Sequence, residues 1–329
     1  PTTKADCLNR LWYALNRWEK GARRDALVVV LHDAEDVVHP DALRVIGLLA
    51  PRFALVQLPV LPLTTARSPW IAGHYCDEFA EAHGKSLWVR ESLGAALPSA
   101  GVGCGFNRAA LGRIAMARGG TPFDEASLTE DYELGLRLGE AGGRGILVRM
   151  RDGQGGLIAT REYFPDTLRA AVRQKARWTV GIALAGWDRL GWSGSWREYW
   201  MRLRDRREAL AAVVLLAAYA GLASAVLLAL ADRLLGRAPT PWPAPLPWLL
   251  VATLVLALWR MLVRMIFVWR TYGPAQALLS VPRTLIANII AIMAARRAVA
   301  IYIRHLRGHD LAWDKTAHRF PGDSSSAEA

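Results

Sequence analysis

The sequence contains a short acidic cluster in which a carboxylate could be held for general-base chemistry. Thr129, Glu130 and Asp131 precede Leu134 and Leu138, which have the i, i+4 spacing of a helix. Thr129 is a good N-cap, and acidic residues in a first turn interact favourably with the helix dipole. The cluster could therefore hold a carboxylate base at the start of a rigid helix. The alternative is an ordinary helix start in which Thr129 only caps.

A second acidic group follows a continuous apolar run at residues 26–31, which is typical of a buried strand. The residues that come next are His32, Asp33, Ala34, Glu35 and Asp36. Ligands of open α/β sheets bind beyond the carboxyl ends of strands. Asp33 and Glu35 could therefore converge on one Mg²⁺ or Mn²⁺ ion through hard oxygen ligands, with Asp36 as an alternative partner. The competing interpretation is an acidic turn before the next helix.

A third group lies on a helix predicted to begin near Asp166. Gln174, Arg177 and Trp178 are related by i+3 and i+4, so one face presents an amide, a guanidinium and an indole. An Arg fork matches diphosphate oxygens, and a Trp plane suits a sugar face or an apolar wall. The alternative is a basic interfacial helix with a Trp anchor.

The elements around these groups alternate between helix and strand. Helices are expected at residues 6–20 and 41–49, and further strands at residues 54–58 and 145–149. Glycines at 101, 103 and 105 would allow close backbone approach to a ligand. Residues 70–90 form either a solvated amphipathic helix or a contact surface for an acceptor. The pattern predicts an α/β domain.

A membrane region is expected after this domain, because 53% of the 329 residues are hydrophobic and 14 are Trp. Residues 209–231 and 246–267 are long and apolar enough to cross a bilayer. The third apolar stretch, residues 275–295, contains Pro282, Arg283 and Asn288. It is therefore predicted to lie on the cytoplasmic membrane surface as an amphipathic helix, with a third membrane span as the alternative.

Charge placement indicates the orientation of these segments. Lys and Arg number 41 against 29 Asp and Glu, and several of the arginines flank the apolar runs, including Arg202, Arg204, Arg206 and Arg207. This is the pattern of cytoplasmic flanks and not of a base-reading helix, so no nucleic-acid partner is expected. The three cysteines are widely spaced and support neither a disulfide framework nor a zinc site.

Taken in order, the three groups resemble a known family. Asp33-Ala34-Glu35, Thr129-Glu130-Asp131 and Gln174-x-x-Arg177-Trp178, followed by membrane segments, are similar to processive family 2 glycosyltransferases of the cellulose and hyaluronan synthase type. Stretches along the whole chain, at residues 98–103, 127–131, 161–166 and 312–315, resemble the bacterial inner-membrane phage adsorption protein B family (NfrB).

The resemblance implies a GT-A-like nucleotide-sugar transferase domain at residues 1–205, a membrane region at 206–303 and a basic, partly disordered tail at 304–329. The first strand of that fold, with its uridine-binding carboxylate, is expected before Pro1. Lys4, in Lys4-Ala5-x-x-Leu8-Asn9, matches a family position near the donor nucleotide. Gln174, Arg177 and Trp178 would complete donor binding, and Asp33 and Glu35 would hold the metal.

The implied activity is inverting transfer of a hexose or N-acetylhexosamine, with Asp131 and Glu130 as catalytic residues. The donor would be a nucleotide-sugar of the UDP type, and the acceptor a growing glycan. The resemblance further implies the bacterial inner membrane, a cytoplasmic catalytic domain, contact with the lipid bilayer and an outer-membrane export partner. The rival hypothesis is a non-catalytic membrane scaffold or phage-adsorption component whose transferase domain is vestigial.

Overall fold

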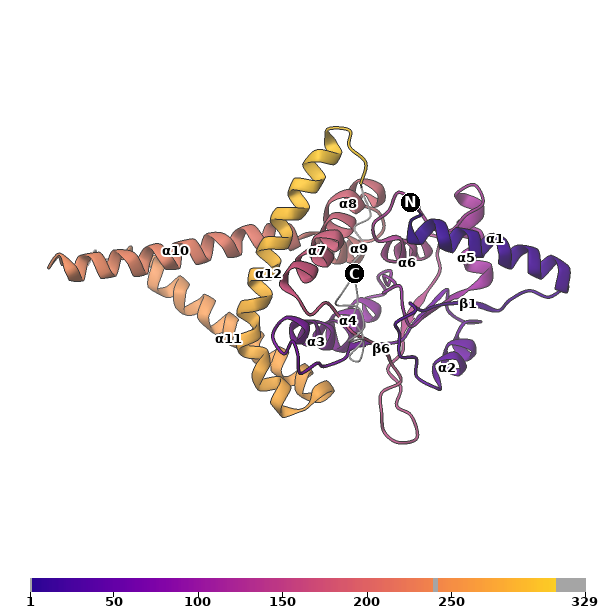
Figure 1. Cartoon of the computed structure of the whole chain (residues 1–329), viewed down its shortest axis with the longest axis horizontal. Coiled ribbons are helices and arrows are strands. Elements are labelled where there is room, and N and C mark those ends of the chain that lie inside the picture. The colour runs from indigo at the N-terminus through magenta and orange to yellow at the C-terminus, as the bar shows by residue number, and fades with distance from the viewer. Residues whose placement is uncertain (1, 239–241, 312–329) are drawn as a thin grey trace, which may run out of the picture.

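The computed structural model describes residues 2–238 and 242–311, which form an α/β domain followed by long apolar helices (Figure 1). The predicted α/β class is confirmed. The stretch at residues 312–315 and the rest of the expected tail lie outside the described residues.

The main sheet has the strand order β1-β4-β2-β5. These strands are β1 (Val28–Leu31), β4 (Cys104–Asn107), β2 (Leu55–Gln57) and β5 (Gly145–Leu147). β4 is antiparallel to β1 and β2, and Leu31 and Gln57 both lie opposite Cys104. The carboxyl ends of β1 and β2 therefore meet the residues that precede β4 at one edge of the sheet. Sequence analysis had placed β1, β2 and β5 correctly.

A second, two-stranded parallel sheet joins β3 (Val60–Pro62) to β6 (Thr160–Glu162). Val37 pairs with Arg161 in an antiparallel bridge. The acidic segment that follows β1 is thereby held beside β6. Neither strand was predicted, because three residues are too few to show a periodic pattern.

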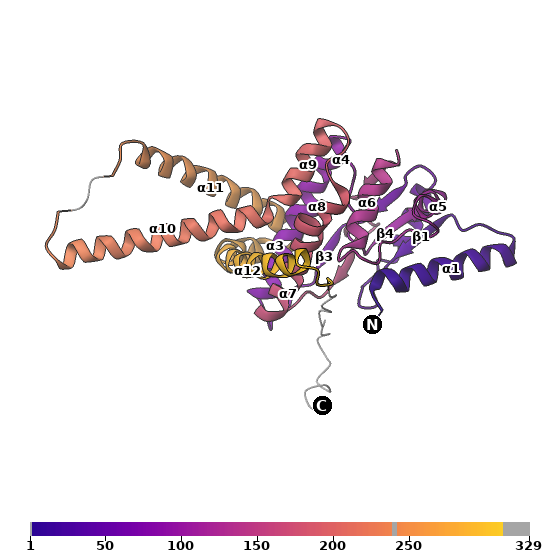
Figure 2. The ribbon, with the colours of Figure 1, turned by 90° about the horizontal axis from the view of Figure 1, so that it is seen from above.

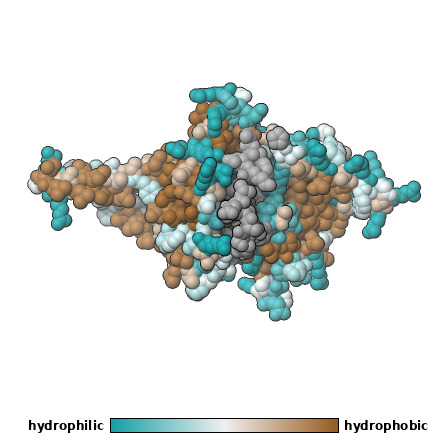
Figure 3. Space-filling view, viewed as in Figure 1, coloured by the Kyte–Doolittle hydropathy of each residue, from teal (hydrophilic) through white to brown (hydrophobic). Residues whose placement is uncertain are grey.

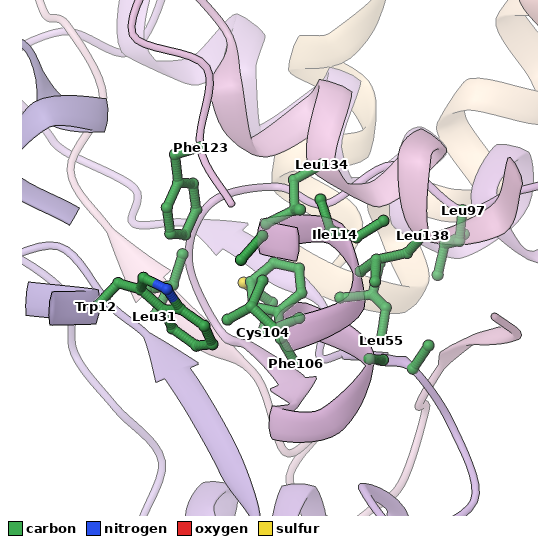
Figure 4. Packing of buried hydrophobic residues seen from close by; sticks show 14 of the residues in the cluster. Trp12, Leu31, Leu55, Leu97, Cys104, Phe106, Ile114, Phe123, Leu134 and Leu138 are labelled. Atoms are coloured by element: carbon green, nitrogen blue, oxygen red, sulfur yellow. The ribbon is translucent and has the colours of Figure 1, made fainter. Parts of the chain in front are cut away.

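Helices cover the main sheet and bury its apolar residues. They are α1 (Lys4–Ala22), α2 (Ala42–Leu49), α5 (Arg108–Ala117) and α6 (Glu130–Glu140). Figure 4 shows Phe106 and Leu55 of the sheet packed against Leu134 and Leu138 of α6. The i, i+4 leucines predicted to fix the acidic cluster are thus buried in the core.

The segment at residues 70–90 is not a solvated helix. It forms α3 (Ile71–Glu81), the π-helix η1 (Ala82–Ser86) and α4 (Leu87–Ser92). His74, Tyr75 and Asp77 are each at most 1% exposed, because α3 packs against both α11 and α12. The polar composition of this segment comes from buried side chains and not from a solvated face.

Between β6 and the membrane region lie α7 (Leu168–Trp178), the π-helix η2 (Thr179–Leu184), α8 (Ala185–Leu190) and α9 (Trp196–Arg206). Two arginines that were predicted to flank the membrane are buried in this part of the domain. Arg202 donates to Glu140 Oε1 at 2.6 Å and to the carbonyl of Leu190 at 2.9 Å, and Arg206 donates to the carbonyl of Gly191. These two guanidiniums therefore form hydrogen bonds within the domain and do not lie at a lipid surface.

Within the described residues, three helices are long and apolar enough to cross a membrane: α10 (Glu208–Leu234), α11 (Pro245–Tyr272) and α12 (Pro274–Leu306). Figure 3 shows hydrophobic surface along α10 and α11. α12 is different, because it runs across the direction of α10 in Figure 1 and is seen nearly end-on in Figure 2. It packs against α3 and α7 of the α/β domain.

A buried ion pair joins α12 to α3. Arg283 Nη1 lies 3.2 Å from Asp77 Oδ1, and both side chains are almost completely buried. The guanidinium also donates to the Pro69 carbonyl and to Gln276 Oε1, each at 2.6 Å. Burial raises the pKa of Asp77 to about 7, although the guanidiniums of Arg283 and Arg264 oppose this shift.

The structure predicts that Arg283→Met destabilises the protein by roughly 3 to 5 kcal/mol, because Asp77 is then buried without its partner. Urea unfolding in detergent micelles measures the change. Arg270→Met is the matched control, since Arg270 is exposed near the end of α11. Adding Asp77→Asn to Arg283→Met should recover part of the loss. Equal stability of the Arg283→Met and Arg270→Met variants would show that the buried pair does not hold α12 in place.

Candidate functional site

A cavity of about 280 Å³ lies at the sheet edge where β1 and β2 end and β4 begins. It is lined by seven of the eight predicted site residues, namely Lys4, Asp33, Glu130, Asp131, Gln174, Arg177 and Trp178. Glu35, the eighth, is not among the lining residues. Four segments that are far apart in sequence, around Lys4, Asp33, residues 130–131 and residues 174–178, therefore converge on one space.

Lys4 and Asp33 form an ion pair at the cavity, with Nζ 2.6 Å from Oδ1. Thr3 caps the first turn of α1 by accepting from the Asp6 amide at 3.1 Å, which fixes the start of the helix on which Lys4 lies. Burial lowers the pKa of Lys4, but the nearby carboxylates of Asp131, Asp33 and Glu130 outweigh burial and raise it above its ordinary value. The ammonium is therefore charged and is shared among these carboxylates.

The Asp131 carboxylate lies directly against the backbone of Gly101. A Cβ atom at Gly101 would stand 1.9 Å from Asp131 Oδ2, and the backbone there has φ +78°. Sequence analysis had expected the glycines of this segment to admit a ligand. Here Gly101 admits the carboxylate of Asp131 itself, and Gly103 the Thr160 side chain.

α6 is held by contacts other than the predicted Thr129 cap. Thr129 stands at the N-cap position, but its side chain makes no capping hydrogen bond. Ser127 Oγ accepts from the Thr129 amide at 3.1 Å and donates to Glu133 Oε1 at 2.7 Å. Glu133 also pairs with Arg189 of α8. The capping prediction was wrong, although these contacts still fix the acidic turn.

Glu130 is buried beside Asp131, and the two carboxyl groups differ in environment. Burial, reinforced by the charge of Asp131, raises the pKa of Glu130 to about 7, although Lys4 and Arg177 oppose this shift. Asp131 is half-buried and accepts from the Tyr132 amide at 2.7 Å. Glu130 therefore keeps its proton to a higher pH than an ordinary Glu, and it lies next to the residue predicted to act as base.

Sequence analysis missed one acidic residue of the site, Glu162 at the end of β6. It lines the same cavity as Asp33. Burial raises its pKa to about 8, reinforced by Asp36, Asp33 and Glu35 in that order. The one available signal was its place in the stretch at residues 161–166, which had carried the family resemblance.

The residues available to a metal are these carboxylates. Among residues 2–238 and 242–311, no group of three His, Cys, Asp or Glu side chains could hold a metal ion. Asp36 uses one oxygen within the chain, because its Oδ2 accepts from the Asp33 amide at 3.0 Å and pairs with His32 at 2.9 Å. Its Oδ1 is buried and has no hydrogen-bond partner among the described residues. The hard oxygens of Asp33 and Glu162 suit a divalent cation, and such a cation would offset both the burial and the neighbouring negative charges that raise the pKa of Glu162.

Three residues of α7, Gln174, Arg177 and Trp178, line the same cavity. Trp178 packs edge-on against Tyr75 and Phe164, with ring centroids 6.2 and 6.5 Å away. Gln174 is buried, and in the described part of the chain its Oε1 has no hydrogen-bond partner. Trp178 is therefore part of the cavity wall, and the Gln174 amide is available to a ligand.

The raised pKa of Glu130 predicts a pH-dependent stability. The folded chain keeps a proton on Glu130 that the unfolded chain releases above about pH 4.5. Its contribution is therefore fully present below pH 4.5 and is lost as pH rises through 7. The melting temperature of the wild type should fall relative to that of Glu130→Gln between pH 5 and pH 8. If the melting temperatures of the wild type and Glu130→Gln changed equally with pH across this range, the raised pKa of Glu130 would be contradicted.

Comparison of the sequence with known proteins identifies one matching family and two similar proteins. Residues 28–295 match Glycosyl transferase family group 2. The chain is 38% identical over 357 aligned residues to bacteriophage adsorption protein B of Escherichia coli K12, covering 99% of this chain and 47% of that protein. The same figures hold for bacteriophage N4 adsorption protein B of Escherichia coli O157:H7. The chain thus spans about half the length of these relatives. It belongs to glycosyl transferase family group 2.

Proposed function

We propose that this chain is the catalytic part of a membrane-bound, inverting glycosyltransferase that moves a sugar from a nucleotide-sugar to a growing glycan. The supporting observation is that Asp131 shares one cavity with Asp33 and Arg177. The donor we propose is a UDP-linked hexose or N-acetylhexosamine. The names of the relatives refer to phage adsorption, so a glycan that also serves as a phage receptor is consistent with them.

The proposed reaction uses Asp131 as the general base. Asp131 accepts the proton of an acceptor hydroxyl as its oxygen attacks the anomeric carbon of the donor. The bond from that carbon to the diphosphate oxygen breaks, and the electron pair leaves with the nucleoside diphosphate. Attack from the face opposite the leaving group inverts the anomeric centre. In its protonated form, which the raised pKa favours, Glu130 can donate a hydrogen bond that positions the acceptor.

The negative charge of the leaving diphosphate would be stabilised by basic residues that line the cavity together with Asp131. Arg177 would bind diphosphate oxygens through its guanidinium fork. Lys4 provides a second positive charge, and Trp178 an apolar wall for the sugar. The Gln174 Oε1 atom would accept a hydrogen bond from a hydroxyl group of the nucleotide-sugar.

Members of this family generally use a divalent metal. Asp33 would hold Mg²⁺ or Mn²⁺ here, together with Glu162 or the originally predicted Glu35. When bound, such an ion neutralises developing negative charge on the diphosphate. The protein holds Asp33 in place for this role through the Lys4 ion pair and through the contact of the Asp33 amide with Asp36.

We further propose that α10 and α11 cross the inner membrane as an antiparallel pair and that α12 lies at the cytoplasmic interface. The direction of α12 and its packing on α3 and α7 support this arrangement. We also propose a transferase domain at residues 1–205 and a membrane region at residues 206–303, a division near the end of α9 at Arg206 and the start of α10 at Glu208. An outer-membrane partner for export would receive the glycan.

Asp131→Asn should reduce glycan synthesis by roughly two to four orders of magnitude while donor binding survives, because the substitution keeps the shape and removes the proton acceptor. Mass spectrometry of glycan made by membranes containing the full-length protein, supplied with a panel of nucleotide-sugars, measures turnover. Near-normal synthesis by this variant would support a vestigial transferase domain or a different base.

Gly101→Ala should abolish activity because its Cβ would displace the Asp131 carboxylate. The matched control is Gly142→Ala, which has the same φ of +78° but no atom within 4 Å of the new Cβ. Both variants carry the strain of a left-handed backbone, about 1 to 2 kcal/mol. Similar activity in the two would mean that the contact between Gly101 and Asp131 does not position the base.

A further inference from the structure

A second and larger cavity, of about 760 Å³, lies between α7 and α12 and shares no lining residue with the first. Its lining includes Arg169, Arg173, Arg296, Arg297 and Arg304. Among the residues that the structure describes, no Asp or Glu lines it, and the sequences of α7 and α12 contain no acidic residue. Arg169, Arg296 and Arg304 alone bring three positive charges to this space, and such a cluster creates a positive field that favours an anion.

Apolar side chains make up the rest of this arginine groove. Leu168 and Val172 come from α7, and Met293 and Ala300 from α12. Leu168 and Met293 remain 38% and 39% exposed. A free inorganic anion gains nothing from such walls, whereas an amphiphile can place its charge on the arginines and its hydrocarbon on the apolar side chains.

The position of the groove favours a membrane source for this amphiphile. α12 runs across the direction of α10 and α11, at the boundary between the apolar helices and the α/β domain (Figures 1 and 2). Three of the five arginines lie on the carboxyl half of α12, whose end is hydrophilic in Figure 3. Phospholipid headgroups occupy this depth if α10 and α11 cross the bilayer.

We propose that the arginine groove binds the phosphate of an anionic phospholipid, with an acyl chain along Met293 and Leu168. The guanidinium fork matches phosphate oxygens in pairs, and a cluster of arginines at a cytoplasmic membrane surface attracts anionic lipid. Arg169 and Arg173 lie on α7, the helix that brings Gln174, Arg177 and Trp178 to the first cavity. A bound lipid therefore anchors α7 to the membrane surface.

Native mass spectrometry tests this proposal on the full chain in neutral detergent. The probes are phosphatidylglycerol and phosphatidylcholine with identical acyl chains. The wild type should bind phosphatidylglycerol more tightly, and the double variant Arg169→Gln with Arg296→Gln should weaken that binding by roughly tenfold. The control variant, Arg17→Gln with Arg113→Gln, removes the same charge from exposed positions on α1 and α5 and should leave binding unchanged.

Several results would overturn the proposal. Equal binding of the two lipids by the wild type would remove the role of charge, and equal weakening in the control variant would make the effect non-specific. Displacement of phosphatidylglycerol by millimolar inorganic phosphate would assign the groove to a free anion. Unchanged melting temperatures of both double variants ensure that a loss of binding reports on the groove and not on unfolding. The experiment measures lipid binding alone. Its result therefore does not depend on whether the chain synthesises a glycan.

Discussion

The site depends on the repulsion among carboxylates gathered at one edge of the sheet. Asp33, Glu130, Asp131 and Glu162 all line one cavity, and buried like charges can remain close only if some are protonated or a cation lies among them. Both a nearby cation and raised carboxyl pKa values are present in this cavity. The Lys4 ammonium binds Asp33 directly, and Glu130 and Glu162 have raised pKa values. A donor diphosphate with its divalent ion would change this balance, so binding should redistribute charge within the cavity.

The fold gathers these groups by simple topology. β4 runs antiparallel to β1 and β2, so the start of β4 lies beside the ends of both strands. The segment containing Gly101, which precedes β4, therefore lies near Asp33, two residues after β1, and near the residues that follow β2. α6 then brings Asp131 onto Gly101, where only a residue without a side chain leaves room. α7 closes the cavity from the side of the membrane helices, since α12 packs on it. The apolar helices therefore support the geometry of the site as well as attach it to the membrane.

The sequence predicted what periodic patterns and ordered motifs can report. The leucines of α6, the strand before Asp33 and the i+3, i+4 face of α7 all lie where their spacing placed them. Glu162 was missed because its neighbourhood depends on the pairing of β3 with β6, which no local pattern encodes. Thr129 was assigned a cap from its residue type, but its side chain faces Gly181 instead. Arg202 was taken for a membrane flank because sequence does not show that Glu140 and the Leu190 carbonyl surround it.

The central claim is that the cavity between Asp33 and Arg177 receives the donor. Photo-crosslinking with an azido-UDP analogue, followed by peptide mass spectrometry of the full-length protein in lipid nanodiscs with Mn²⁺, tests it most directly. The account predicts labelled peptides that contain Lys4, Asp33 or residues 174–178, with labelling competed by unlabelled UDP. Labelling confined to the arginine groove between α7 and α12, or labelling that UDP does not compete, would contradict it.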